Sequence, residues 1–419
     1  MKIHRLLVAL LMGGFITAMA VGKQTVQAQE RTPAPSRPLL LTHYMPWYQA
    51  PPINPTWGWH WTMNHFNPNH TGVNGLPELA SHTVPLTGPY DSRDETVLEY
   101  QVLTMKLSGI DGVIVDWYGT SDYEDYAAVN TATGRLFDAI ARAGMRFIIC
   151  YEDRTLLNMT GTGVLDADQA VVQGQADMQY VHEQWMSQPA YVTYEDQPLL
   201  FVYGPLYFRQ PDNWTALFTG IDPTPALVTL DRHMEFAALA SYPWPPMHMA
   251  GGIELPPAVI ESYLELFYRN ARRHPITVGS AFPGFEDIYE QAGVRSSYGS
   301  IAPRDGETLR YTLDTALAQN PYIVQLVTWN DYGEGTTIEP THEYGYHYLE
   351  TIQAARQTLD ATFTATPDDL RLPLRLFEAR RAHQGDDAIN AELDRAFDAI
   401  VAGDLAAAAS ILDTIAPAS

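Results

Sequence analysis

The sequence predicts an α/β fold: a (β/α)8 TIM barrel followed by a small C-terminal α-helical appendage. Short apolar runs alternate with amphipathic helical patterns, as in parallel α/β proteins. The alternation repeats about eight times, which matches a barrel better than an open sheet. Polar and aromatic residues cluster directly after the apolar runs, where such a barrel carries its chemistry. No glycine-rich phosphate turn follows the first run, which argues against a doubly wound nucleotide-binding sheet.

The barrel elements follow from hydrophobic periodicity. Runs such as Gly112-Val-Ile-Val-Asp116 are apolar without alternation, which is typical of strands buried on both faces. The expected strands are 39–44, 112–116, 146–152, 198–203, 226–231, 276–281 and 322–329. Helical spacing of apolar residues predicts helices between them, and Gly144 marks the end of one. These helices are 95–107, 126–143, 166–187, 257–273, 307–319 and 346–359.

The two ends of the chain differ from the barrel. Helical periodicity at 372–382, 388–402 and 405–415, interrupted by glycines, predicts the appendage. We therefore divide the chain into a barrel over 38–362 and an appendage over 363–419.

The first residues resemble an export signal. A basic start precedes the apolar stretch 6–21, and Val26-Gln27-Ala28 is a small-residue cleavage site. We expect a signal peptide over 1–28 and a flexible lead-in over 29–37. A membrane anchor is the alternative, but the apolar stretch is short and polar residues follow it. The expected location is secreted, or cell-surface or periplasmic, with no integral membrane segment after cleavage.

Composition narrows the class of partner. A formal charge of −24 opposes binding to nucleic acid or anionic lipid. Cys150 is the only cysteine, so no intramolecular disulfide can form, and its apolar surroundings predict a buried thiol. His43, His60, His65 and His70 match no compact zinc spacing. No serine-hydrolase elbow or nucleotide-binding motif is present.

The segment 327–340 carries the strongest chemical signal. The last apolar run ends in a glycine-containing loop that holds Asp331 and Glu334, flanked by Trp329 and Tyr332. Cleavage of a glycosidic bond needs one carboxyl group that holds a proton and a second that stabilises or assists the cationic sugar. Aromatic rings beside them can bind the apolar faces of sugars. The alternative is an ordinary polar turn with two solvated acids.

The loop after the first strand is rich in aromatic residues. Tyr44-Met45-Pro46-Trp47-Tyr48 is followed by Trp57-Gly58-Trp59-His60-Trp61. Such a loop could form an aromatic-walled cleft, or a minor hydrophobic core under a long connection. After the third strand, Glu152-Asp153-Arg154 could bind sugar hydroxyls or form a structural ion pair.

These two aromatic segments together resemble the opening signature of glycoside hydrolase family 99. The block Arg304-x-Gly306-Glu307, Ala316, Pro321 and 328–340 resembles that family's closing signature, and Trp-Asn-Asp-Tyr-Gly-Glu is also similar to the fungal α-1,3-glucanases of family 71. The resemblance implies a (β/α)8 barrel and a retaining, endo-acting α-glycosidase without metal or other cofactor. It places the general acid/base on Glu334. Asp331 takes the position of a family-99 glutamate that assists the sugar's own 2-hydroxyl, whereas family 71 carries aspartate there.

The resulting hypothesis is a secreted glycoside hydrolase that cleaves α-glycosidic bonds in a polysaccharide or oligosaccharide, either α-mannan or α-glucan. Glu334 and Asp331 are the expected catalytic pair. The side chains expected to bind substrate are Tyr44, Trp47, Tyr48, His60, Trp61, Asp116, Trp117, Tyr118, Glu152, Trp329, Asn330, Tyr332 and Glu339. The alternative is a non-catalytic carbohydrate-binding protein on a degenerate barrel.

Overall fold

The computed structural model describes residues 37–72, 74–231, 234 and 237–415. The predicted signal peptide, 1–28, and all but the last residue of the predicted lead-in lie outside the described residues. The described residues belong to one compact unit. No helix in the described ranges is long and apolar enough to cross a bilayer.

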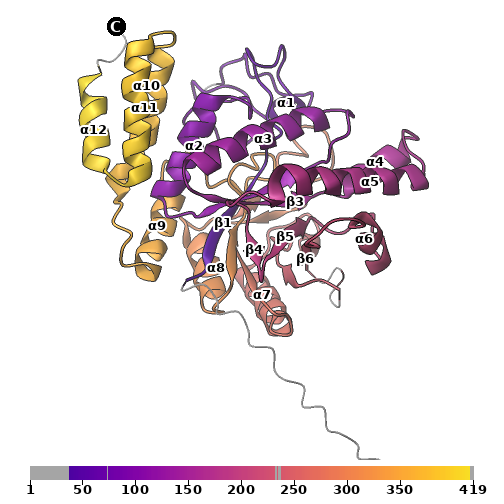
Figure 1. The fold of residues 1–419 in the computed structure, drawn as a ribbon. Helices are drawn as coiled ribbons and strands as arrows, with labels where there is room; N and C mark the ends of the chain where they lie inside the picture. The colour runs from indigo at the N-terminus through magenta and orange to yellow at the C-terminus, as the bar shows by residue number, and fades with distance from the viewer. Residues whose placement is uncertain (1–36, 73, 232–233, 235–236, 416–419) are drawn as a thin grey trace, which may run out of the picture. The chain divides into compact units, whose positions relative to one another are not determined.

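Eight parallel strands form a nearly closed barrel, which confirms the predicted fold class (Figure 1). They are β1 (Leu39–Tyr44), β2 (Gly112–Trp117), β3 (Arg146–Tyr151), β5 (Gln197–Val202), β6 (Ala226–Leu230), β7 (Ala240–Tyr242), β8 (Val278–Ala281) and β11 (Ile323–Leu326). Neighbours in the chain are neighbours in the sheet, and β11 returns to pair with β1. β7 contacts β8 without joining it in a described ladder. The carboxyl ends of all eight strands therefore surround one opening.

Helices lie around the outside of the strands (Figure 1). They are α2 (Glu95–Leu107), α3 (Tyr126–Arg142), α4 (Arg154–Gly161), α5 (Ala167–Val181), α6 (Pro211–Leu217), α7 (Pro257–Ala271), α8 (Glu307–Leu317) and α9 (His347–Leu359). Local sequence sets their starts: the Asp94 side chain accepts from the backbone N–H groups of Thr96 and Val97 at the start of α2. Asp166 and Gln169 form a capping box on α5.

Shorter elements decorate the barrel. β4 (Thr193–Tyr194) pairs with β5 in antiparallel orientation, and β9 (Phe285–Glu286) pairs with β10 (Ser300–Ile301) in the loop after β8. α1 (Trp59–Thr62) is a single turn in the loop after β1. A second small apolar core, formed by Met63, Ala80, Ile288 and Ala292, joins the loop after β1 to the loop after β8.

The predicted elements agree with the structure except where the pattern is short. β7 was missed because Ala-Ser-Tyr contains no apolar run, and α4 and α6 were missed because they are short helices in polar loops. The helix expected over 166–187 ends its α-helical part at Val181 and continues as a π-helical turn, His182–Met186. Cys150 is fully buried, as predicted.

The C-terminal helices α10 (Leu372–Ala382), α11 (Asp387–Ala402) and α12 (Leu405–Thr414) form the predicted appendage. The Arg380 guanidinium makes two hydrogen bonds to Glu99 on α2, at 3.0 and 3.1 Å. The Phe377 ring lies 5.9 Å from that of Tyr100, also on α2. The appendage thus shares the barrel's apolar core.

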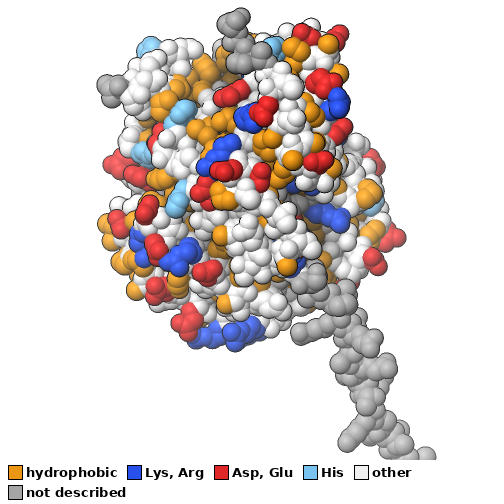
Figure 2. Space-filling view, turned by 90° about the vertical axis from the view of Figure 1, so that its left-hand side faces the viewer, with side chains coloured by type: hydrophobic (Ala, Val, Ile, Leu, Met, Phe, Trp, Pro, Cys, Tyr) orange, Lys and Arg blue, Asp and Glu red, His pale blue; other side chains and the backbone are white. Residues whose placement is uncertain are grey.

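On the side of the molecule shown in Figure 2, acidic and basic side chains lie interspersed on the surface.

Candidate active site

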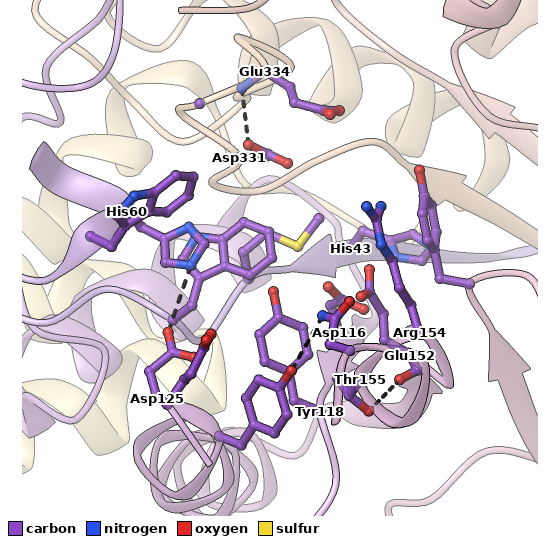
Figure 3. Close-up of a pocket in the computed structure, with 18 of the residues that line it drawn as sticks. His43, His60, Asp116, Tyr118, Asp125, Glu152, Arg154, Thr155, Asp331 and Glu334 are labelled. Atoms are coloured by element: carbon purple, nitrogen blue, oxygen red, sulfur yellow. Dashed lines mark hydrogen bonds and ion pairs between the residues drawn. The ribbon is translucent and has the colours of Figure 1, made fainter. Parts of the chain in front are cut away.

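A cavity of about 730 Å³ lies at the carboxyl ends of the barrel strands. Loops that follow β1, β2, β3, β5, β7, β8 and β11 all contribute to its lining. Two carboxyl groups, Asp331 and Glu334, come from the loop after β11. Figure 3 shows them on the opposite side of the cavity from Asp116, at the end of β2, and Glu152, just after β3. Four acidic side chains from three strand ends therefore face one space.

The loop after β11 is a tight turn organised by Asp331. The Asp331 backbone N–H donates to Oγ1 of Thr328 at 2.8 Å, and Asp331 Oδ1 accepts from the backbone N–H of Glu334 at 3.0 Å. Burial raises the pKa of Asp331 to about 6, against the effect of the backbone N–H groups of Glu334 and Gly333. At pH 7 this carboxyl group is mainly ionised.

Glu334 has the opposite character. Burial raises its pKa well above the ordinary range, and the charges of Asp331, Asp287 and Glu152 raise it further, while Arg295 opposes the shift. A raised pKa favours the protonated form of Glu334, and a protonated carboxylic acid can give its proton to a leaving oxygen. Environments that push two neighbouring carboxyl groups apart in pKa are typical of acid and base pairs. This pair can therefore supply both roles.

The far side of the cavity holds a second pair of acids. Burial raises the pKa of Glu152 to about 7, and Arg154 counteracts that shift. Burial also raises the pKa of Asp116 well above its usual range, with Glu152 the largest charge contribution. Asp153, between Glu152 and Arg154 in sequence, has a structural role instead. Its carboxylate accepts from three backbone N–H groups of the loop after β5, those of Leu206, Tyr207 and Phe208.

Aromatic side chains form the wall nearest the first loop. The Trp47 indole stacks on the His60 imidazole, with ring centres 4.4 Å apart and planes 13° apart. His60 Nε2 lies 3.7 Å from Asp125 Oδ2. Because burial lowers the pKa of His60 to about 3, the ring is neutral at pH 7 and this contact is not an ion pair there. Tyr118 continues the wall, with its ring centre 6.1 Å from that of Trp47.

The structure divides the predicted site residues into two groups. Those that line the cavity are Asp331, Glu334, Trp47, His60, Asp116, Tyr118 and Glu152. Those that lie behind its wall are Tyr44, Tyr48, Trp61, Trp117, Trp329, Asn330, Tyr332 and Glu339. The side chains of the second group are almost completely buried and do not line the cavity, so direct substrate binding by them stays a prediction, and the structure shows them supporting the wall.

Hydrogen bonds show what the buried group supports. Glu339 accepts from Tyr332 and Tyr90 hydroxyls at 2.7 and 2.8 Å and from Gln101 Nε2 at 2.7 Å. The Asn330 side chain bonds both the N–H and the C=O of Met45, at 2.8 and 3.0 Å. Asn330 therefore fixes the first loop to the loop that carries the acids.

The remaining buried aromatic residues are held in the same way. Tyr48 donates its hydroxyl to the Asn330 carbonyl at 2.8 Å, and Tyr44 donates to Gln101 at 2.7 Å. Trp61 Nε1 donates to the Tyr90 carbonyl at 2.7 Å. Trp117 Nε1 donates to Asn130 Oδ1 at 3.0 Å. The aromatic first loop thus supplies both a cavity wall and a small core behind it.

The predicted site leaves out six aromatic residues of the lining. Trp59, Tyr126 and Tyr203 lie in segments that the sequence identifies as a loop, a helix and a strand, whereas Trp244, Tyr289 and Tyr298 lie in none of the predicted elements. Trp244 follows the missed strand β7, and Tyr289 and Tyr298 lie in the long loop after β8. Trp244 could have been identified from the sequence only if β7 had been predicted as a strand, because Trp244 lies just after its end. The part of the chain that the structure describes contains no group of three His, Cys, Asp or Glu side chains that could hold a metal ion.

Comparison with known proteins identifies relatives in sequence. The family model "Glycosyl hydrolase family 99" matches residues 37–225. The chain is 22% identical over 329 residues to a glycoprotein endo-alpha-1,2-mannosidase-like protein of Danio rerio, covering 71% of this chain and 69% of the relative. It is 24% identical over 384 residues to the uncharacterized protein WxcX of Xanthomonas campestris, covering 83% of this chain. The chain spans about half of the length of that relative, 52%.

Solved structures show the same fold. The GH99 endo-alpha-mannosidase of Bacteroides thetaiotaomicron, in complex with BIS-TRIS-propane, is similar with a TM-score of 0.55 and 16% identity over 77% of this chain and 99% of that one. A second structure of that enzyme gives a TM-score of 0.53 and 17% identity over 77% and 97% of the two chains. A protein described as glycoside hydrolase-like gives 0.52, with 13% identity over 77% and 94%.

Proposed function

The chain is glycosyl hydrolase family 99-like, and from that premise we propose that it is a glycoside hydrolase that cleaves α-mannosidic bonds within a polysaccharide or oligosaccharide. One observation carries the proposal: Asp331 and Glu334 line a single cavity, and their surroundings favour an ionised Asp331 beside a protonated Glu334. The α-glucan alternative rests on the Trp-Asn-Asp-Tyr-Gly-Glu string alone.

The proposed reaction retains the anomeric configuration. Glu334 gives its proton to the glycosidic oxygen as the bond to the anomeric carbon breaks. Asp331 stays ionised and stabilises the positive charge on the sugar, or takes the proton of the 2-hydroxyl as that oxygen attacks the anomeric carbon. In the second half, Glu334, now ionised, takes a proton from the attacking water as the water oxygen bonds to the anomeric carbon. In the 2-hydroxyl route, the bond between the 2-oxygen and the anomeric carbon breaks at this step, and Asp331 returns its proton to the 2-oxygen. Asp331 is one methylene shorter than glutamate, so the turn that brings it toward the cavity matters for either role.

The other lining residues would bind the sugars. Trp47 and Tyr118 offer ring faces, and Trp47 is oriented by its stacking on His60. Asp116 and Glu152 offer acceptors for hydroxyl groups. A cavity of about 730 Å³ has room for more than one sugar ring, which supports endo action on a longer chain. The N-terminal pattern over 1–28 supports export, so the proposed substrate is outside the cytoplasm.

The test is product release by the purified protein from α-mannans, α-1,3-glucan and other α-glucans. Glu334→Gln keeps the shape of the side chain and removes the proton donor, so turnover should fall about 10²- to 10⁴-fold. Glu290→Gln is a matched control, because Glu290 is exposed in the neighbouring loop and does not line the cavity. Equal activity of Glu334→Gln and wild type would refute the assignment. Binding without cleavage of any polymer, unchanged in Glu334→Gln, would favour the non-catalytic alternative.

A further inference from the structure

The charged groups that line the cavity are strongly unbalanced. The six acids are Asp116, Glu124, Asp125, Glu152, Asp331 and Glu334. Arg154 is the one guanidinium or ammonium group among the described lining residues. Burial lowers the pKa values of both lining histidines, His43 and His60, to about 3, so neither is a cation at neutral pH. The described lining therefore presents more acceptors than cationic donors.

Asp116 is a buried acid that lacks a hydrogen-bond donor for one of its carboxyl oxygens. Its side chain is only 5% exposed, and its Oδ1 has no hydrogen-bond partner among the described residues. Asp153, one position beyond Glu152, is equally buried but receives three backbone N–H donors. A buried acceptor without a donor destabilises the folded protein, so such a group is retained where a ligand supplies the donor.

Strand register places Glu152 beside Asp116. In the parallel ladder, Asp116 is the partner of Cys150, and the Glu152 backbone N–H extends the ladder to the Trp117 carbonyl at 3.0 Å. Side chains two residues apart on a strand point to the same face, so Asp116 and Glu152 are diagonal neighbours at the barrel mouth. Arg154 counteracts the raised pKa of Glu152, whereas no positive charge contributes to that of Asp116.

We propose that Asp116 and Glu152 form a subsite for a protonated amino group, so that the preferred glycan carries a free amino sugar next to the bond that is cut. An ammonium group has three N–H donors and no acceptor, and can bond both carboxylates at once. Because burial raises the pKa of Asp116 and of Glu152, binding of the ammonium group is accompanied by release of a proton from this pair. Charge-assisted hydrogen bonds of this kind are stronger than those from a neutral hydroxyl. The identity of the glycan rests on the proposed function; the binding of an amine does not.

The test is a calorimetric binding series at pH 7. The probes are methyl α-D-mannopyranoside, its derivatives with an amino group in place of a single hydroxyl, and the N-acetyl form of each. We expect an amino derivative to bind about tenfold more tightly than both the parent and its N-acetyl form. Asp116→Asn should reduce this advantage, measured as the ratio of the two affinities in the same variant, to about twofold. Glu152→Gln should act in the same direction and serves if Asp116→Asn does not fold.

A matched control is Asp138→Asn, an exposed acid on α3 outside the cavity, which should keep the full amine advantage. No preference for any amino derivative, or a preference that persists in both variants, would overturn the subsite. Cleavage of neutral α-mannan by a protein without amine preference would leave the proposed function standing and remove only the subsite. An Asp116-dependent amine preference in a protein that cleaves nothing would establish the subsite and remove the function.

Discussion

Glu339 offers the sharpest test of how the buried layer behind the cavity is held. Its carboxyl group is 2% exposed and accepts from Tyr90, Gln101 and Tyr332. Burial nevertheless raises the pKa of Glu339 to about 7, above its ordinary 4.5, while hydrogen-bonding side chains, with Gln101 the largest contribution, oppose the shift. The folded protein therefore binds this proton more tightly than the unfolded chain does.

The sign and size of the effect follow from linkage. Between pH 4.5 and 7 the folded state holds the proton and the unfolded state has released it, so the free energy of unfolding falls as pH rises. At about 1.36 kcal/mol per pH unit, the whole loss is about 3 kcal/mol, complete just above pH 7. About 2.5 kcal/mol of it falls between pH 5 and 8. Glu339→Gln removes the titration, so the stability of wild type relative to this variant should shrink by that amount.

The assay is urea unfolding of wild type and Glu339→Gln at several pH values from 5 to 8. Other acids titrate alike in both proteins and cancel in the difference. Glu265→Gln is the matched control, because Glu265 has 75% of its side chain exposed and its difference from wild type should stay within about 0.5 kcal/mol at every pH. A Glu339→Gln difference that is flat, or that grows as pH rises, would refute this account of the buried carboxyl group.

Two further predictions concern the cavity and its border. Activity should require ionised Asp331, so kcat/KM of the wild type should fall about tenfold per pH unit below the pKa of about 6. Asp331→Asn should lower kcat/KM about 10³-fold. The same variant should also lose this fall in kcat/KM at acid pH. An unchanged fall in the variant would show that another group causes it. Asp153→Asn should weaken the anchoring of the loop after β5 and cost about 2 kcal/mol of unfolding free energy, measured by urea denaturation. Wild-type stability of this variant would show that the three hydrogen bonds are dispensable.

The barrel could be predicted because most of its strands are continuous apolar runs in the sequence. β2 and β3 are runs of β-branched and aromatic residues buried on both faces, and no other local structure accounts for them as well. β7 offers three residues with a serine at its centre, and only the neighbours on either side make it a strand. β7 is a strand because of its tertiary contacts, and the local sequence pattern does not encode those contacts.

The position of Asp331 and Glu334 in the cavity lining could be predicted because both acids lie in one short loop with a recognisable sequence. The wall of the cavity opposite these two acids could be predicted in part, since Asp116 and Glu152 stand at the ends of apolar runs. Tyr289 and Tyr298 could not, because the loop after β8 has no period that fixes which side chains turn inward. A loop side chain faces the cavity or the core according to contacts made from distant parts of the chain.

The first loop shows the same limit for aromatic residues. Trp47 and Trp61 are both largely buried, yet one lines the cavity and the other packs behind it with its indole N–H bonded to the Tyr90 carbonyl. Sequence chemistry favours an aromatic ring equally in a sugar-binding wall and in a small core. Both alternatives that the sequence leaves open for this loop, a cleft wall and a small core, have a counterpart in the structure, and only the fold shows which ring belongs to which.

Hydrogen-bond donors separate the acids of this site more clearly than burial does. Glu339 and Asp331 are both buried and both have raised pKa values, but Glu339 receives three side-chain donors. Within the described residues, the carboxyl groups of Asp116, Glu152 and Glu334 receive no side-chain hydrogen bond, and Asp331 is bonded only by the backbone of its own turn. A buried acid that stabilises the fold receives its hydrogen bonds from the protein, whereas a buried acid that binds a substrate lacks protein donors and receives them from the substrate. By this criterion Glu339 stabilises the fold, and Asp116, Glu152, Asp331 and Glu334 are the lining acids that we expect to contact the substrate.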